Sequence, residues 1–269
     1  MTEQIIAQRL GIALRQVQGT VRLLRDGATI PFISRYRKEA TGSLDELQVG
    51  AVKEQLDKLT ELEARKQTVL STIGEQGKLT DELRKRIEAC WEAVELEDIY
   101  LPYKPKRRTR ATVARERGLE PLANSIMAQN SHDIARQAQR FVTADVPTPE
   151  EAIAGACDII AERVSEDERA RNSVRRTAAR EGAVHSRLVK GKEQEGVKYS
   201  DYFDATSPLR TVSSHRFLAM RRGMDEGVLK ISVEMDADRI TEGLCRQFVR
   251  HGSATREWME AAVADAFKR

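Results

Sequence analysis

Residues 44–98 carry two runs of apolar residues with the period of an α-helix. The first run comprises Leu44, Leu47, Val52, Leu56, Leu59, Leu62, Val69 and Ile73, and the second comprises Leu79, Leu83, Ile87, Cys90, Trp91 and Val94. Residues three and four positions apart lie on the same face of a helix, so each run predicts a helix with one buried side. The sequence GEQGKLT breaks the period between them. We therefore expect a long antiparallel helical hairpin over residues 44–98.

Residues 5–25 fit a helix-turn-helix template. A small residue, Ala7, stands four positions before the turn glycine Gly11. The second helix would expose polar and basic side chains, namely Arg15, Gln16, Gln18, Arg22 and Arg25. Arginine and glutamine can read base edges or hold phosphates. The same spacing also occurs in helix pairs that never touch DNA, so the template alone does not predict base-specific reading.

The connector at residues 28–46, ATIPFISRYRKEATGSLDE, places a basic segment beside an apolar one. We expect three apolar residues, Ile30, Phe32 and Ile33, to anchor it in the core. The basic segment would lie on the surface and comprises Arg35, Tyr36, Arg37 and Lys38. Gly42 would supply a turn, and Ser43 would cap the next helix in a box with Glu46. A buried Arg–Glu network explains these charges as well as a phosphate contact does.

The rest of the chain is predicted to be helical apart from a small β element. Pro102 and Pro105 end a helix and leave an extended basic stretch. Residues 183–203 lack helical periodicity, and VLKISVEM at 228–235 alternates like a strand. Helices are expected at 214–222, 238–250 and 253–269. The fold class is therefore mainly α, multi-helical, with a helix-turn-helix-like N-terminus, a long helical hairpin and a small β element near the C-terminal third.

Composition agrees with a helical, non-membrane protein. Of the 269 residues 32% are charged and 5% aromatic, which suits helices with long solvated faces. The longest apolar runs are a few residues, so we expect no membrane span and no signal peptide. The three cysteines lie far apart without a CxxC pair, which favours a reducing cytoplasm and argues against structural zinc.

Basic charge is concentrated in three segments. Residues 1–38 carry 7 basic and 2 acidic residues, residues 102–118 carry 7 and 1, and residues 169–222 carry 13 and 5. Arginine outnumbers lysine 32 to 13, which favours bidentate contacts to phosphate or carboxylate. A codon bias together with solvated helix faces would give the same excess.

The stretch KPKRRTR combines cations with two nearby tyrosines, Tyr100 and Tyr103. The candidate phosphate-binding residues here are Lys104, Lys106, Arg107, Arg108 and Arg110. Extended cationic backbone beside aromatic rings is typical of phosphate neutralisation with base stacking. The alternative is a solvated loop paired to the acidic helix at residues 92–98.

No pattern indicates catalysis. The motifs GxSxG, HExxH and GxGxxG are absent, and the glycines at 191 and 196 lack the Lys-Ser/Thr of a phosphate-binding loop. The histidines stand too far apart to suggest a metal cluster. We therefore predict no enzyme activity, no catalytic residue, no cofactor and no metal.

Four stretches resemble the Tex family of bacterial transcription accessory proteins. They are ATIPFISRYRKEATGSLDE, ELEDIYLPYKPKRRTRATVARERGLEPLA, VKGKEQEGVKYSDYF and SHRFLAMRRGMDEGVL. The resemblance implies a cytoplasmic, mostly helical nucleic-acid-binding protein that acts in transcription and is related to a eukaryotic elongation factor and histone chaperone. Family members are longer and carry an RNase-H-like domain, helix-hairpin-helix elements and a C-terminal OB-fold. This chain resembles their N-terminal portion.

The resemblance divides the chain into a Tex-type N-terminal helical domain at 1–190 and the start of a central helical region at 191–269. The last helix has no Gly or Pro stop, so we expect the natural protein to continue. Two functions are compatible with these observations. The first is nucleic-acid binding, to RNA, DNA or both, by a monomer through its basic surfaces. The second is a protein-docking scaffold that contacts the transcription machinery or the downstream domains without binding nucleic acid.

Overall fold

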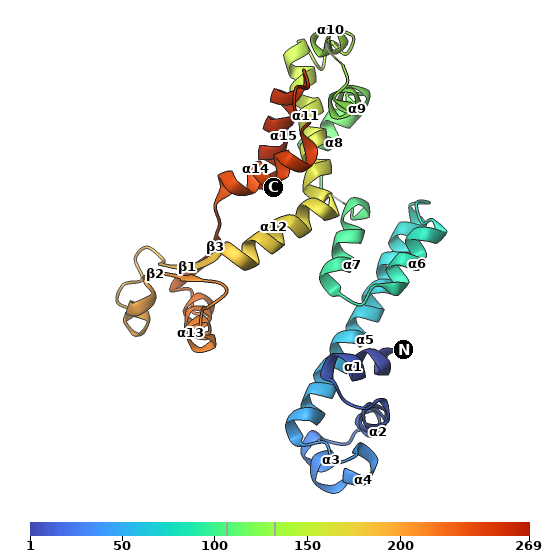
Figure 1. The fold of residues 1–269 in the computed structure, drawn as a ribbon. Coiled ribbons are helices and arrows are strands. Elements are labelled where there is room, and N and C mark those ends of the chain that lie inside the picture. The colour runs from blue at the N-terminus through green and yellow to red at the C-terminus, as the bar shows by residue number, and fades with distance from the viewer. Residues whose placement is uncertain (106, 132) are drawn as a thin grey trace. The chain divides into compact units, whose positions relative to one another are not determined.

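A computed structural model describes residues 1–105, 107–131 and 133–269 of the chain. The chain folds into two compact units, Met1–Lys104 and Pro105–Arg269, each of which is described by itself (Figure 1). Both units are mainly helical, as predicted, and a small three-stranded antiparallel sheet lies in the second. The domain boundary predicted near residue 190 from the family resemblance stays a prediction.

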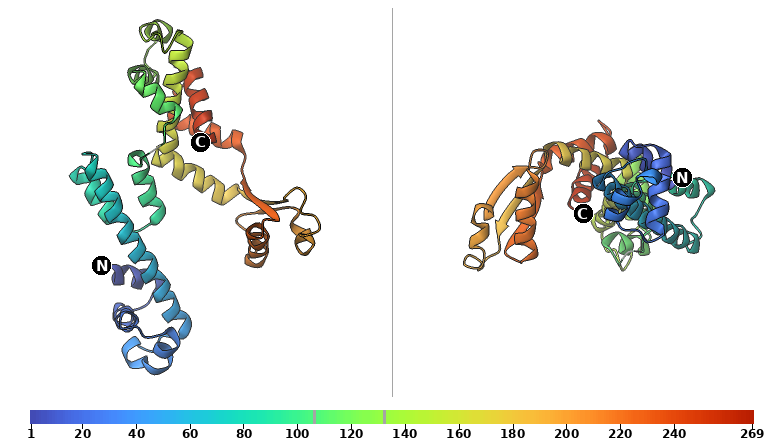
Figure 2. Two further views of the ribbon diagram at one scale, coloured as in Figure 1. Left: turned by 180° about the vertical axis from the view of Figure 1, so that it is seen from behind. Right: turned by 90° about the horizontal axis from the view of Figure 1, so that it is seen from below.

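The first unit is built around one long helix. Its elements are α1 (Thr2–Leu10), α2 (Leu14–Arg25), α3 (Ile30–Tyr36), α4 (Lys38–Thr41), α5 (Glu46–Glu75), α6 (Asp81–Ala89), α7 (Ala93–Tyr100) and η1 (Leu101–Tyr103). Helices α1 to α4 gather around the N-terminal half of α5, as Figures 1 and 2 show. The core between them includes Ile6, Val17, Val21, Ile33, Val49 and Val52, which are all buried. Helix α2 is therefore held in place by its packing against this core.

The connector at 28–46 differs from its prediction in three respects. Residues 30–36 form a short helix, α3, which starts with Pro31 in its first turn. Ile33 is fully buried as expected, but Phe32 is 40% exposed and does not anchor the connector. The cap of α5 is Asp45 rather than Ser43, because the Asp45 carboxylate accepts from the Gln48 N–H at 2.7 Å. Gly42 makes the expected turn with φ of 61°.

The second arm of the predicted hairpin is broken. Helix α6 ends at Ala89, and Cys90 adopts an extended backbone before α7 begins. The buried Lys66 of α5 donates from Nζ to the Glu88 carbonyl at 2.8 Å, and the ammonium lies 3.8 Å from the centre of the Trp91 ring. A helix leaves its last carbonyls without partners, so a cation at this point favours an end to α6.

The second unit packs helices around α11 and α15. Its elements are α8 (Arg110–Glu116), α9 (Glu120–Ala128), α10 (Ile134–Gln139), α11 (Pro149–Glu166), α12 (Glu168–Glu181), β1 (Ala183–Leu188), η2 (Val197–Tyr202), β2 (Asp204–Pro208), α13 (Ser214–Asp225), β3 (Leu229–Glu234), α14 (Ala237–Phe248) and α15 (Arg256–Lys268). The core of the helical part includes Leu122, Ile126, Ile159, Ile160 and Val263. Thr148 caps α11, and its hydroxyl accepts from the Glu151 N–H at 3.2 Å.

The sheet joins residues that are distant in sequence. Its strand order is β2-β1-β3, and both pairings are antiparallel. Strand β3 confirms the alternating pattern at 228–235, and β1 falls in the segment that lacked helical periodicity. Strand β2 was not predicted. The chain enters the sheet from α12 and leaves it into α14, so the sheet brings these two helices together (Figures 1 and 2).

Candidate nucleic-acid interface

Helix α2 turns one polar and basic face to the solvent. Arg15, Gln18, Arg22 and Arg25 follow one another at intervals of three, four and three residues, which places them on one side of the helix. All four are exposed, and we call them the α2 stripe. Three guanidinium groups and an amide along one helix face are suited to bind phosphate oxygens.

The opposite faces of α2 fix the orientation of this stripe. Val17 and Val21 are fully buried in the core. Gly19 lies against α4, because a Cβ at this position would stand 2.0 Å from the carbonyl oxygen of Ala40. A rotation of α2 would expose the valines or break this close contact. The α2 stripe is therefore held toward water.

Few carboxylates neutralise the α2 stripe. Arg25 faces Glu3 at 3.9 Å, which is a long contact between exposed groups. Within the described residues, Arg15 and Arg22 form no ion pair. Exposed ion pairs of such length contribute little, so the positive charge of this face is almost uncompensated.

The sequence predicts that Gln16 contacts nucleic acid, but both polar atoms of its side-chain amide form hydrogen bonds within the protein. Its Oε1 accepts from the backbone N–H of Ala13 at 3.1 Å, and its Nε2 donates to the carbonyl of Gly42 at 3.0 Å. These bonds satisfy the start of α2 and tie it to the turn before α5. Gln16 therefore lies apart from the α2 stripe.

The segment 35–38 adds exposed cations beside two aromatic rings. Arg35, Arg37 and Lys38 are exposed, and so are Phe32 and Tyr36. The rings of Phe32 and Tyr36 have centroids 5.6 Å apart, and the Arg37 guanidinium carbon lies 5.5 Å from the Phe32 centroid. These side chains form a solvated aromatic and cationic cluster rather than the buried Arg–Glu network that the sequence also allowed.

The predicted basic stretch at 104–110 divides between the two units. Lys104 closes the first unit, and Arg107, Arg108 and Arg110 belong to the second. Lys106 lies outside the described residues. The prediction of an extended stretch fails at its end, because Arg110 begins α8. The Thr109 hydroxyl caps this helix by accepting from the Thr112 N–H at 3.0 Å.

Two arginines of this stretch bind carboxylates inside the second unit. Arg108 contacts Glu116 at 2.9 Å. Arg110 contacts Asp158 of α11 at 3.2 Å and Asp265 of α15 at 3.0 Å. Arg110 therefore ties three helices together. Arg107 is exposed and has no ion pair among the described residues, so it is the better candidate for an outside anion.

The sequence pointed to a basic segment at 169–222 but singled out no residue in it. The structure places Arg180 of α12 beside Arg239 and Arg246 of α14 along one groove. Arg239 and Arg246 come from a segment with a net negative charge, so their contribution could not be read from charge counts. The sheet between the two helices creates this proximity.

Chemistry typical of an active site is not apparent in the described residues. Among them, no group of three or more His, Cys, Asp or Glu could hold a metal ion. Burial raises the pKa of all three thiols, that of Cys157 to about 11, so they stay protonated and weakly nucleophilic at neutral pH. In the same part of the chain, no helix is long and apolar enough to cross a membrane.

Comparisons with known proteins match two parts of the chain to domains of the same kind of protein. Residues 1–74 match the Tex-like protein N-terminal domain, and residues 129–269 match the Tex central region-like family. The chain is 46% identical to the transcriptional accessory protein Tex of Neisseria gonorrhoeae over 87% of this chain and 31% of that protein. It is 45% identical to protein YhgF of Escherichia coli over 99% of this chain and 35% of that protein.

A more distant relative is S1 RNA-binding domain-containing protein 1 of Homo sapiens, 26% identical over 99% of this chain and 28% of that protein. Fold and surface together define a mainly helical protein with exposed arginine-rich faces. The chain belongs to the Tex family of transcription accessory proteins. It spans about a third of the length of the curated relatives it matches, 31% of the first.

Proposed function

We propose that this chain is a non-catalytic part of a Tex-like transcription accessory protein and that its basic surfaces bind nucleic acid. The proposed partners are RNA, DNA or both, and the proposed location is the cytoplasm. The α2 stripe carries this proposal, because it presents three exposed arginines with one distant carboxylate. Membership of a transcription family and a relative named for an RNA-binding domain add support.

The binding mechanism follows from the chemistry of these groups. Guanidinium groups of the α2 stripe would neutralise backbone phosphates and release condensed counterions. The rings of Phe32 and Tyr36, beside Arg37, offer exposed faces on which an unpaired base could stack. Phosphate contacts of this kind position a strand without reading its sequence. Binding should therefore depend strongly on salt and weakly on sequence.

Fluorescence anisotropy across a salt series tests this proposal, with a single-stranded RNA and a duplex DNA of equal length. We expect log K to fall linearly with log salt at a slope of roughly −0.7 to −0.9 per phosphate neutralised. The triple variant R15A/R22A/R25A should weaken binding and reduce the magnitude of the slope by about two to three, because up to three phosphate contacts are lost.

The matched control is K78A/R84A/K85A, which removes the same charge from exposed positions elsewhere in the first unit. The control should bind almost as tightly as the natural chain. Equal losses in both triple variants would mean that net charge, and not the α2 stripe, drives binding. No binding by the natural chain at low salt would contradict the proposal and favour the protein-docking scaffold.

A further inference from the structure

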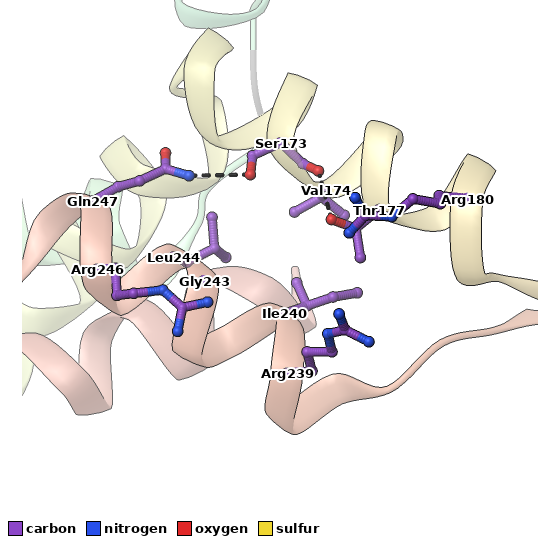
Figure 3. Close-up of a pocket in the computed structure, with 10 residues that line it drawn as sticks. All are labelled: Ser173, Val174, Thr177, Arg180, Arg239, Ile240, Gly243, Leu244, Arg246 and Gln247. Carbon is purple, nitrogen blue, oxygen red and sulfur yellow. Dashed lines mark hydrogen bonds between the residues drawn. The ribbon is translucent and has the colours of Figure 1, made fainter.

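Helices α12 and α14 enclose a groove of about 370 Å³ in the second unit (Figure 3). Arg180 of α12 and both Arg239 and Arg246 of α14 line it. Arg239 and Arg246 are seven residues apart, and Gly243 lies between them on the same helix face. Figure 3 shows Arg239 beside Ile240 and Arg246 beside Gly243, further along α14. The α12–α14 groove is therefore bordered by cations from both of its walls.

The charge of the groove is poorly neutralised. None of the described residues that line it is acidic. Arg180 and Arg239 share a single carboxylate, that of Glu181, at 2.8 Å each. Arg246 forms no ion pair within the described residues. One carboxylate for three guanidinium groups leaves an anion-binding surface, since guanidinium groups bind phosphate oxygens bidentately.

Gly243 leaves open space in one wall of the groove. Among the described residues, the one atom that a Cβ at this position would meet within 4 Å is an Arg246 guanidinium nitrogen, at 3.9 Å. Because Gly243 lines the groove, a large side chain at this position would occupy part of it.

The groove also contains neutral hydrogen-bonding groups. The Gln247 amide donates to the Ser173 hydroxyl oxygen at 3.0 Å, which leaves the hydroxyl hydrogen of Ser173 available to a ligand. Thr177 lies one turn further along α12 and donates to the Ser173 carbonyl at 3.1 Å. Hydroxyl donors beside guanidinium groups are common contacts to the phosphates and sugars of nucleic acids.

We propose that the α12–α14 groove binds the phosphodiester backbone of a nucleic acid, at a site separate from the α2 stripe. This proposal rests on the proposed function and adds a second contact surface to it. An extended polyanion fits better than a small phosphate, because α12 carries two further exposed arginines, Arg169 and Arg176, at helical spacing with the lining residues Ser173 and Arg180. The segment from 169 to 222, which begins with this helix, carries 13 basic against 5 acidic residues.

The test uses the complete chain and the same two oligonucleotides. The R239A/R246A variant should weaken binding several-fold and reduce the magnitude of the salt slope by about one to two. G243L should weaken binding as well, because it fills the groove without changing the charge. The control R216A/R222A removes two exposed arginines from α13 in the same unit and should bind like the natural chain. Thermal unfolding by circular dichroism verifies that each variant is folded.

The possible outcomes separate the two proposals. If the natural chain binds RNA or DNA and R15A/R22A/R25A weakens it, but R239A/R246A binds normally, the groove proposal is wrong and the proposed function stands. If the natural chain binds neither oligonucleotide, both fail. If polyglutamate binds with a dependence on Arg246 and nucleic acid does not, the groove is a site for acidic protein segments, which also overturns the proposal.

Discussion

At the scale of single residues, the arginines of this protein have two roles, and the carboxylates near each arginine decide which role it has. Arg22 lies on a solvated helix face and has no ion pair among the described residues. Arg115 instead contacts Glu162 at 2.6 Å, and this carboxylate is only 5% exposed. The Thr109 hydroxyl donates to the other carboxylate oxygen at 3.0 Å. The first arginine is available to an outside anion, and the second holds α8 on α11.

Replacing Arg115 with alanine should therefore destabilise the second unit. The variant removes the Arg115 guanidinium from the buried Glu162 carboxylate, and removal of one partner of a buried pair costs about 3 kcal/mol or more. Urea unfolding monitored by circular dichroism measures the loss. Arg117→Ala is the control, since Arg117 is exposed and its removal should change the free energy of unfolding by less than about 0.5 kcal/mol. Equal effects in the two variants would contradict this role of Arg115.

At the scale of elements, the contact of α2 with α4 requires Gly19. An ideal Cβ there would lie 2.0 Å from the Ala40 carbonyl oxygen, which belongs to the backbone and cannot swing away. We expect Gly19→Ala to displace α4 and to lower the free energy of unfolding by about 1–3 kcal/mol, as overpacking does. Nucleic-acid affinity should fall too, because α4 carries Lys38.

Gly50 provides the control for this prediction. It lies inside α5, and no atom of the described residues lies within 4 Å of an added Cβ. Gly50→Ala should raise the free energy of unfolding by up to about 1 kcal/mol, because alanine has the higher helix propensity. Denaturant unfolding of both variants measures the two changes in the free energy of unfolding. If Gly19→Ala were more stable than the natural chain, α4 would accommodate the added methyl group without a loss of stability, and the prediction would be wrong.

The sheet contains a histidine that joins all three strands. His185 of β1 is 7% exposed, and its Nδ1 and Nε2 lie 2.6 Å from Glu234 and 2.7 Å from Asp204. Hydrogen bonds to Glu234 and then to Asp204 raise the pKa of His185, against the opposing effects of burial and of Arg187. Only the protonated imidazole can donate to both carboxylates. The charged form is therefore the one that ties β2 and β3 to β1.

The stability of the sheet should accordingly depend on pH. The folded pKa lies above the unfolded value of about 6.5, so the contribution of His185 is complete below about pH 6.5 and is lost as pH rises through the folded pKa. We expect the difference in Tm between the natural chain and His185→Gln to shrink from pH 5 to pH 9. His215→Gln, at an exposed position of α13, serves as control. A difference that is constant with pH would refute this account.

At the scale of the whole molecule, both compact units present positive surface. The α2 stripe and the cluster at 35–38 belong to the first unit, and the α12–α14 groove belongs to the second. Each surface lies on or between helices held by a packed core, so the backbone that carries its cations is fixed by that core. Preorganised charge of this kind lowers the entropic cost of binding.

The spacing of residues along the chain was sufficient to predict part of the candidate site. Arg15, Arg22 and Arg25 recur at helical intervals opposite buried valines, so the pattern alone placed them on an exposed face. Gln16 is one position from Arg15, yet its amide is used by Ala13 and Gly42. The position of Gly42 in space depends on the turn between α4 and α5, which local periodicity does not encode.

The sequence by itself determined the helical class, the long helix α5, the strand β3 and the blocks of charge, because each depends on residues that are neighbours in the chain. Only the tertiary structure decided which arginines stay available. Arg110 binds Asp265, which is 155 positions away in the sequence. Arg180 and Arg239 line the same groove because the sheet between α12 and α14 in the chain brings these two helices together. Ion pairs and grooves depend on distances in space, and burial against distant segments sets those distances.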